Sequence, residues 1–298
     1  MAENLIDLRR RIKSVKNTQK STRAMKTVSA SKMRRSVGEL NRTKPVMDKI
    51  ESLLRRVGPA VDIESHPLLK KRDSGKTLIV AISADKGLCG AFNSHLIEGT
   101  EALYRRHAQE NDDNPLLVTV GNKVFNHFNK RNYEIKRNFK GVMSRLKYHH
   151  ALDLSKYLQD IFLDIEEDIK QIEFIYTQYV SASRQEITVK QLFPIAGEWD
   201  RAEGGNNNNE EDIEYIFEPS REAIFEFLLP KYINSCVHQV MLQSAASEHV
   251  SRMVAMETAT QNASDMIRGL TLTLNKLRQA TITKELLEII TATEALKI

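Results

Sequence analysis

Four residues ahead of an apolar segment have the composition of a phosphate-binding loop. Ser74-Gly75-Lys76-Thr77 matches the end of the motif whose backbone cradles nucleotide phosphates. That motif also requires a glycine five residues before Gly75, where this sequence has Lys70, and a helix after the loop. Here a strand-like segment follows. The pattern therefore indicates a turn leading into a strand, not a nucleotide site.

A second glycine-containing segment lies between a predicted strand and a predicted helix. Ala84–Asn93, with the sequence ADKGLCGAFN, has two glycines at a position where parallel-sheet proteins often bind phosphate. The spacing of the dinucleotide-binding fingerprint is absent. Two interpretations stay open, a ligand site and a tight or partner-facing turn, and the spacing favours the turn.

The remaining chemical groups indicate no catalysis. Adjacent histidines on a helix diverge, so we expect no metal at His149-His150, and Glu166-Glu167-Asp168 is interpreted as a solvated helix face. Cys89 and Cys236 lie outside any CxxC pattern, which argues against a disulfide framework or a zinc site. No nucleophile-and-base set stands out. We therefore predict a non-catalytic chain with no cofactor and no metal.

The two ends of the chain have the period of long helices. One stripe, whose positions are Leu5, Leu8, Ile12, Val15, Gln19 and Thr22, alternates spacings of three and four; it slips near Met25, resumes at Met33 and stops at Gly58-Pro59. The C-terminal seam alternates four and three without an error, which is typical of a coiled coil. Its positions are Leu242, Ala246, His249, Met253, Met256, Thr260, Ala263, Ile267, Leu270, Leu274, Leu277 and Thr281. We predict that the two end helices pair antiparallel.

The middle of the chain predicts an α/β domain with a mostly parallel, Rossmann-like sheet. The expected strands are 77–83, 116–120, 172–181 and 186–193, with 213–217 as a further candidate, and the expected helices are 91–109, 124–129 and 151–170. A Gly/Asn-rich segment at 204–209 is expected to be a loop. The predicted domains are 1–60 (N-terminal coiled-coil helix), 76–218 (globular α/β domain) and 219–298 (C-terminal coiled-coil helix), with the last helix beginning near Pro219-Ser220.

Charge and aromatic residues are distributed unevenly over the 298 residues. Residues 1–60 hold 16 Lys or Arg against 5 Asp or Glu, a net +11, so the rest carries −6 of the total +5. All 19 aromatic residues lie between Phe92 and Tyr232. No segment has the length of apolar sequence that spans a bilayer. A basic arm predicts an anionic partner; because it lacks aromatic residues for stacking, a protein partner is favoured over nucleic acid.

Several segments closely resemble the gamma subunit of the F-type ATP synthase, and together they cover nearly the whole chain. These segments are Arg11–Lys20, Ala24–Lys26, Ala30–Arg35, Asp85–Asn93, Ser247–His249, Arg252–Met256 and Asn275–Glu285. One departure is Ala292-Thr293, where that family usually has Gly-Ala. The loop at 204–209 resembles a lineage-specific extension.

The resemblance implies a central-stalk rotor shaft that couples ion flow through a membrane c-ring to ATP synthesis or hydrolysis. The implied partners are the alpha and beta subunits of the catalytic ring, the epsilon subunit and the c-ring. It also implies one copy per complex, no nucleic acid and a peripheral location on the cytoplasmic face of the bacterial inner membrane. The implied partner contacts are Lys20, Met25, Arg252, Arg278, Gln279, Thr283 and Glu285.

Among these, Met25 is expected to pack, because it lies where the stripe slips. Two alternatives remain at this point: a basic coiled-coil adaptor or nucleic-acid-binding scaffold with an α/β module, and a small nucleotide-using α/β enzyme.

Overall fold

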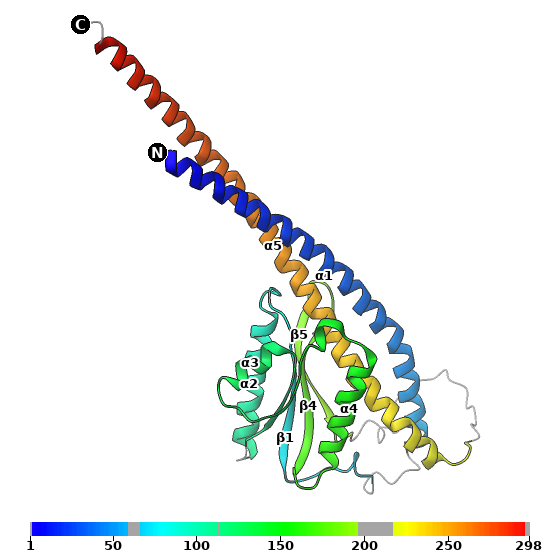
Figure 1. Cartoon of the computed structure of the whole chain (residues 1–298). Helices are drawn as coiled ribbons and strands as arrows, with labels where there is room; N and C mark the ends of the chain where they lie inside the picture. Colours follow the sequence, from blue (N-terminus) through cyan, green and yellow to red (C-terminus); the bar gives the residue numbers. More distant parts are fainter. Residues whose placement is uncertain (1, 59–65, 112–113, 196–216, 296–298) are drawn as a thin grey trace. The chain divides into compact units, whose positions relative to one another are not determined.

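In the computed structural model, which describes residues 2–58, 66–111, 114–195 and 217–295, the strand segments form one five-stranded sheet (Figure 1). The strands are β1 (Lys76–Ile82), β2 (Leu116–Val120), β3 (Ile135–Phe139), β4 (Ile169–Tyr179) and β5 (Gln185–Phe193). Their order is β3-β2-β1-β4-β5, and only the β4–β5 pair is antiparallel. The apolar runs of β1 and β2 are buried along almost their whole length, as central parallel strands require. The predicted mostly parallel sheet is confirmed.

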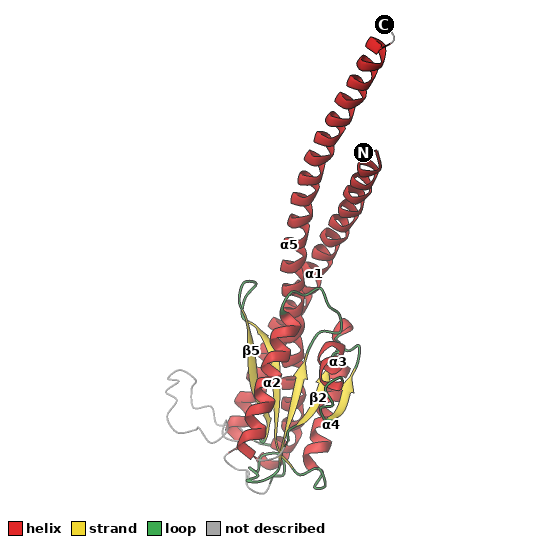
Figure 2. Ribbon diagram, turned by 90° about the vertical axis from the view of Figure 1, so that its left-hand side faces the viewer, coloured by secondary structure: helices red, strands yellow, loops and turns green. Residues whose placement is uncertain are grey.

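Helices cover both faces of this sheet (Figures 1 and 2). One face packs under α2 (Phe92–Asn111) and α3 (Asn122–Asn129), in a cluster with Leu96 and Phe128 at its centre. The other face packs under α4 (Tyr148–Leu163) and parts of the two long helices, α1 (Ala2–Val57) and α5 (Arg221–Ala295). A short 3₁₀ turn, η2 (Met143–Arg145), precedes α4. The result is a three-layer arrangement in which the sheet is the middle layer.

The two long helices end near the residues that the sequence indicates. The last α-helical residue of α1 is Val57, directly before Gly58-Pro59, and α5 begins at Arg221, directly after Pro219-Ser220. Contacts divide the chain into two compact units. The helical pair comprises the described residues of Met1–Ala30 and Arg252–Ile298, and the α/β body comprises those of Ser31–Ser251. The three-part division at 1–60, 76–218 and 219–298 stays a prediction.

The turn that resembles a phosphate-binding loop leads into a strand, as predicted. Lys76 is the first residue of β1, and its N–H donates to the carbonyl oxygen of Asp168 at 2.7 Å. Gly75 has φ +119°, and a Cβ at this position would lie 2.5 Å from the same carbonyl oxygen. Glycine is needed here because the turn packs directly against the backbone that precedes β4.

Two parts of the secondary-structure prediction are wrong. The helix expected over 151–170 ends at Leu163, because the Asp164 carboxylate accepts the N–H of Glu166 at 3.0 Å and turns the chain. Glu166-Glu167-Asp168 is therefore a turn and not a helix face; the Glu167 carboxylate lies 2.7 Å from the ammonium of Lys136. This contact raises the pKa of Lys136.

The other error is the omission of β3, an edge strand. Its sequence IKRNF carries polar residues at its centre, which protect an exposed edge but conceal the strand pattern. The predicted loop at 204–209 and most of the candidate strand 213–217 lie outside the described residues.

The prediction that the rings of His149 and His150 diverge is also wrong. Their centroids lie 4.0 Å apart, edge to face. His150 bends back over the first turn of α4, where its Nδ1 accepts the N–H of Lys147 at 3.3 Å, and this brings the two rings together.

Candidate functional site: the partner-contact surface of the helical pair

Three side-chain contacts fix the direction and register of the helical pair. Gln19 Nε2 donates to Ser264 Oγ at 2.7 Å, and the Thr22 and Thr260 hydroxyls share a hydrogen bond of 2.7 Å. The Lys26 ammonium lies 2.6 Å from a Glu257 carboxylate oxygen. Residue numbers rise along α1 while their partners fall along α5. The pairing is therefore antiparallel, as predicted, and both chain ends lie at the same end of this unit (Figure 1).

The coiled-coil seam predicted for α5 is confirmed at all of its positions. Each of the twelve residues from Leu242 to Thr281 is buried or half-buried. On α1 the predicted slip near Met25 is wrong. The covered positions continue at the same spacing through Thr22, Lys26 and Ser29. The seam looked interrupted in the sequence because these positions carry polar residues.

The predicted contact residues lie outside this seam. Six of them have exposed side chains, and Arg252 is half-buried. Met25 is 40% exposed and lies beside the seam, and its packing role stays a prediction. Exposed residues on a rigid helix are available to a partner. The exposed six are Lys20, Met25, Arg278, Gln279, Thr283 and Glu285.

These residues do not form one site. Lys20 and Met25 flank the contacts to Ser264 and Glu257, whereas Arg278 lies about 30 Å farther along α5 than Glu257 at roughly 1.5 Å per residue. The predicted contact residues of the helical pair therefore fall into separate groups, one midway along the pair and one near the C-terminal end. A partner that touches both must extend along the helices.

The sequence analysis missed the apolar end of α5. Thr281 is the last half-buried residue, and residues 282–293 are all exposed. Five large apolar side chains lie in this stretch and are 48–60% exposed: Ile282, Leu286, Leu287, Ile289 and Ile290. Exposed apolar patches are typical of surfaces that contact another molecule. The signal in the sequence was a second apolar stripe, because Ile282, Leu286, Ile289 and Ile290 have the spacing of one helix face, and this face is not that of the seam.

The segment after β1 is a tight turn held by its own side chains. The Asp85 carboxylate accepts the N–H groups of Gly141 at 3.0 Å and Ser144 at 2.8 Å. Asn93 accepts the N–H of Ala84 at 3.2 Å and donates to Cys89 Sγ at 3.0 Å. Leu88 has φ +62° and is 62% exposed. A left-handed leucine on a braced turn favours a partner contact over a phosphate cradle.

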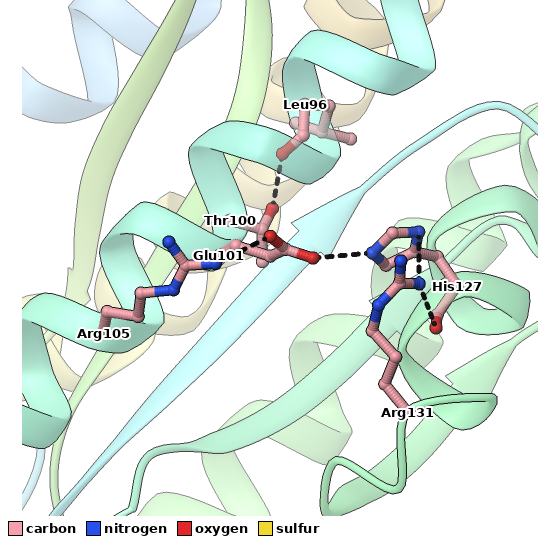
Figure 3. Close-up of polar contacts among 6 residues, drawn as sticks. All are labelled: Leu96, Thr100, Glu101, Arg105, His127 and Arg131. Atoms are coloured by element: carbon pink, nitrogen blue, oxygen red, sulfur yellow. Dashed lines mark hydrogen bonds and ion pairs between the residues drawn. The ribbon is translucent and has the colours of Figure 1, made fainter.

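One polar cluster between α2 and α3 has acid–base groups (Figure 3). Glu101 contacts His127 Nε2 at 2.7 Å and Arg105 at 3.1 Å, while Arg131 lies 3.0 Å from His127 Nδ1. Because a guanidinium only donates, Nδ1 accepts and Nε2 carries the hydrogen. The nearby Thr100 hydroxyl donates to the carbonyl of Leu96 at 2.7 Å and is not activated by the histidine. The cluster joins two helices and lacks a positioned nucleophile.

Other perturbed groups of the α/β body are structural. Burial lowers the pKa of His238 and raises the pKa of Tyr176, which belongs to the core under α5. Within the described ranges, no three His, Cys, Asp or Glu side chains are grouped to hold a metal ion. Likewise, none of the helices described contains a stretch long and apolar enough to cross a membrane.

Comparisons of the sequence with known proteins give matches over almost the whole chain. The sequence model of the family described as ATP synthase matches residues 4–296. The ATP synthase gamma chain of Pelotomaculum thermopropionicum is 40% identical over 294 residues, covering 99% of both chains. That of Geotalea uraniireducens is 37% identical with the same coverage.

Solved structures give the same result. A chain of the Tetrahymena thermophila mitochondrial ATP synthase central stalk and c-ring structure is 25% identical, with a TM-score of 0.57, covering 80% of this chain and 98% of that one. A chain of the Euglena gracilis mitochondrial ATP synthase rotor has the same fold, with a TM-score of 0.63 at 17% identity, covering 95% of this chain and 100% of that one. The family expected from the sequence is confirmed: this chain belongs to the ATP synthase gamma chain family, the non-catalytic subunit of the central stalk.

Proposed function

We propose that this chain transmits rotation between a membrane c-ring and a catalytic head of alpha and beta subunits, as a single copy that also contacts an epsilon subunit. Its place would be the cytoplasmic face of a bacterial inner membrane. The observation that carries the proposal is the antiparallel helical pair with exposed cationic flanks and an exposed apolar end. The Tetrahymena relative comes from a central stalk with a c-ring, which supports the same assembly.

The surface of the pair fits a position inside a ring of larger subunits. Cationic side chains of α1, including Arg10, Lys13 and Lys20, are exposed and suit acidic loops on the surrounding subunits. The apolar end of α5 suits an apolar sleeve in the head. The absence of aromatic residues from the helical pair keeps it thin.

Rotation through such a shaft exchanges mechanical and chemical free energy. One asymmetric shaft contacts identical catalytic subunits differently, so each subunit is stabilised in a different conformation. This amounts to a coupling free energy between shaft angle and nucleotide affinity, and the coupling is reciprocal. Ion-driven rotation would then change nucleotide affinities, and nucleotide binding would drive rotation.

The proposed midway contact zone is tested with Met25→Lys in a complex reconstituted into vesicles. An added cation beside the seam forms an unwanted charge-assisted bond with an acidic partner loop. We expect normal assembly and continued ATP hydrolysis but fewer ions pumped per ATP. Val46→Lys, at an exposed position of α1 in the α/β body, is the matched control and should pump normally. Full pumping per ATP by Met25→Lys would contradict this contact.

The second zone is tested with Arg278→Ala. An exposed arginine suits bidentate pairing with a partner carboxylate, and its loss should lower turnover several-fold, since one such bond contributes roughly 1.5–3 kcal/mol. The unfolding temperature of the isolated chain should hardly change, because the side chain packs against nothing in the seam. Arg268→Ala, also exposed on α5, is the control. Equal turnover in both variants would make Arg278 ordinary helix surface.

A further inference from the structure

A concave basic site in the α/β body contains none of the residues proposed above as partner contacts. Its volume is about 400 Å³, within the range of small-ligand sites. Three segments far apart in the sequence line it: one turn of α1, the loop around η2, and α5. Its cationic groups are Lys32 and Arg35 from α1 and Arg145 and Lys147 from the loop.

The charges in this site are unbalanced. Glu39 is the one carboxylate in the lining, and its oxygen lies 3.1 Å from Arg35 Nε. Within the described part of the chain, no carboxylate lies at ion-pair distance from Lys32, Arg145 or Lys147. Holding like charges around one concavity costs free energy unless an anion occupies it. The site therefore fits an anion with more than one negative charge.

The cations stand on a framework that the fold fixes. The floor consists of residues from the core: Met143, Leu242 and Ala245 are buried, and His249 is also buried. Asp85 accepts the backbone N–H groups of Gly141 and Ser144, which holds the basic loop from outside the site. A braced loop loses little conformational entropy when a ligand binds.

We propose that this site binds a condensed phosphate group, with inorganic pyrophosphate as its simplest form. Arginine and lysine together suit phosphate oxygens, because arginine offers paired donors and lysine a point charge. The Ser36 and Ser144 residues of the lining add polar groups. No Phe, Tyr or Trp side chain lines the concavity, and its one imidazole, His249, is buried, so the phosphates and not a nucleobase would be recognised. The concavity is open to solvent, and its size favours a small anion over an acidic protein segment, which needs a longer groove.

The proposal is independent of the rotor function and is tested on the full-length chain by titration calorimetry with inorganic pyrophosphate. We expect one saturable site. Lys32→Gln and Arg145→Gln should each weaken binding about tenfold, the loss of one charge-assisted contact. Both residues are exposed, so the fold should remain intact, which circular dichroism checks. Lys156→Gln, an exposed lysine of α4 outside the lining, makes the same charge change and should bind as wild type.

Titrations with ATP and with an acidic peptide distinguish the possible sources of the phosphate group from a competing protein ligand. If ATP also binds, and Arg145→Gln weakens its binding to the same extent, then the triphosphate group of a nucleotide is one source of the condensed phosphate that this site recognises. Absence of saturable pyrophosphate binding overturns the proposal, as does binding that Lys32→Gln and Arg145→Gln leave unchanged. An acidic peptide such as oligo-glutamate that binds in an Arg145-dependent manner, where pyrophosphate does not, would show a protein-docking surface instead.

Discussion

The same two helices bury different amounts of apolar surface in the two units. In the described part of the helical pair, the buried apolar residues are Ile12, Met256 and Ala263, and three contacts of the seam are polar: an amide to a hydroxyl, a hydroxyl to a hydroxyl, and an ammonium to a carboxylate. In the α/β body, Leu54 of α1 and Phe225 of α5 belong to one large apolar cluster with the sheet. Burial of apolar surface supplies most folding free energy. We therefore expect the body to be the more stable of the two units.

The largest effect is expected from removing core volume in the body. Phe174 of β4 is 1% exposed, so Phe174→Ala should lower the free energy of unfolding by about 3–5 kcal/mol. Denaturant titration measures this loss. Phe227→Ala, at an aromatic position that is 62% exposed, is the control and should cost far less.

Hydrogen exchange measures which regions of the chain lose stability in the Phe174→Ala variant. Amides of β1 and β4 should exchange faster, whereas those of 252–281 should keep their wild-type rates. If both regions change together, the two units unfold as one, and the contrast between them is wrong.

An intermediate effect is expected from the hydroxyl pair of the seam. Thr22→Ala should cost about 1 kcal/mol, because it leaves the Thr260 hydroxyl without this partner in a half-buried position. The double variant Thr22→Val with Thr260→Val replaces both hydroxyls by methyl groups and should be neutral or stabilising. Hydrogen-exchange rates of the α5 amides around Thr260 measure the stability change in the single and in the double variant.

The matched control for the hydroxyl pair is Thr18→Val, an exposed α1 threonine whose hydroxyl bonds only to Ser14 within its own helix. If the double variant destabilises the pair as much as Thr22→Ala does, the polar layers stabilise the seam. The polar contacts would then not be its weak part.

Sequence periodicity predicted the parts of the fold in which one face is apolar. The twelve-position seam of α5 and the buried strands β1 and β2 follow directly from their spacing. The method failed where polar residues occupy structural positions. Lys26 and Ser29 continue the seam, and β3 is a strand with a charged centre. The residue type at each of these positions suits the residues that it contacts in the folded chain, and the sequence alone does not identify those contacts.

The candidate site was harder to predict than the fold. Resemblance indicated residues with exposed side chains on the pair, but it gave no reason to connect Asp85 with the loop at 141–144. It also gave no reason to bring Lys32 and Arg145 to one concavity. Both depend on how α1, α5 and the loop around η2 come together, which is a property of tertiary structure.

The smallest expected effect is a dependence of stability on pH that differs between the two units. All eight histidines lie between His66 and His249, within the α/β body, and burial lowers the pKa of His238 below its ordinary value of 6.5, opposed by the nearby Glu39 charge. The unfolded chain therefore binds the proton first as the pH falls. The contribution of neutral His238 to the stability of the body is therefore complete above pH 6.5 and is lost as the pH falls from there to the folded pKa.

Unfolding in denaturant from about pH 7 to about pH 5 should show this decline, and His238→Gln should reduce its slope. The residual slope comes partly from His150, whose pKa burial also lowers. Exchange of the amides in 252–281 should not follow this titration, because the helical pair contains no histidine. A slope unchanged by His238→Gln would mean that another group governs the acid sensitivity of the body.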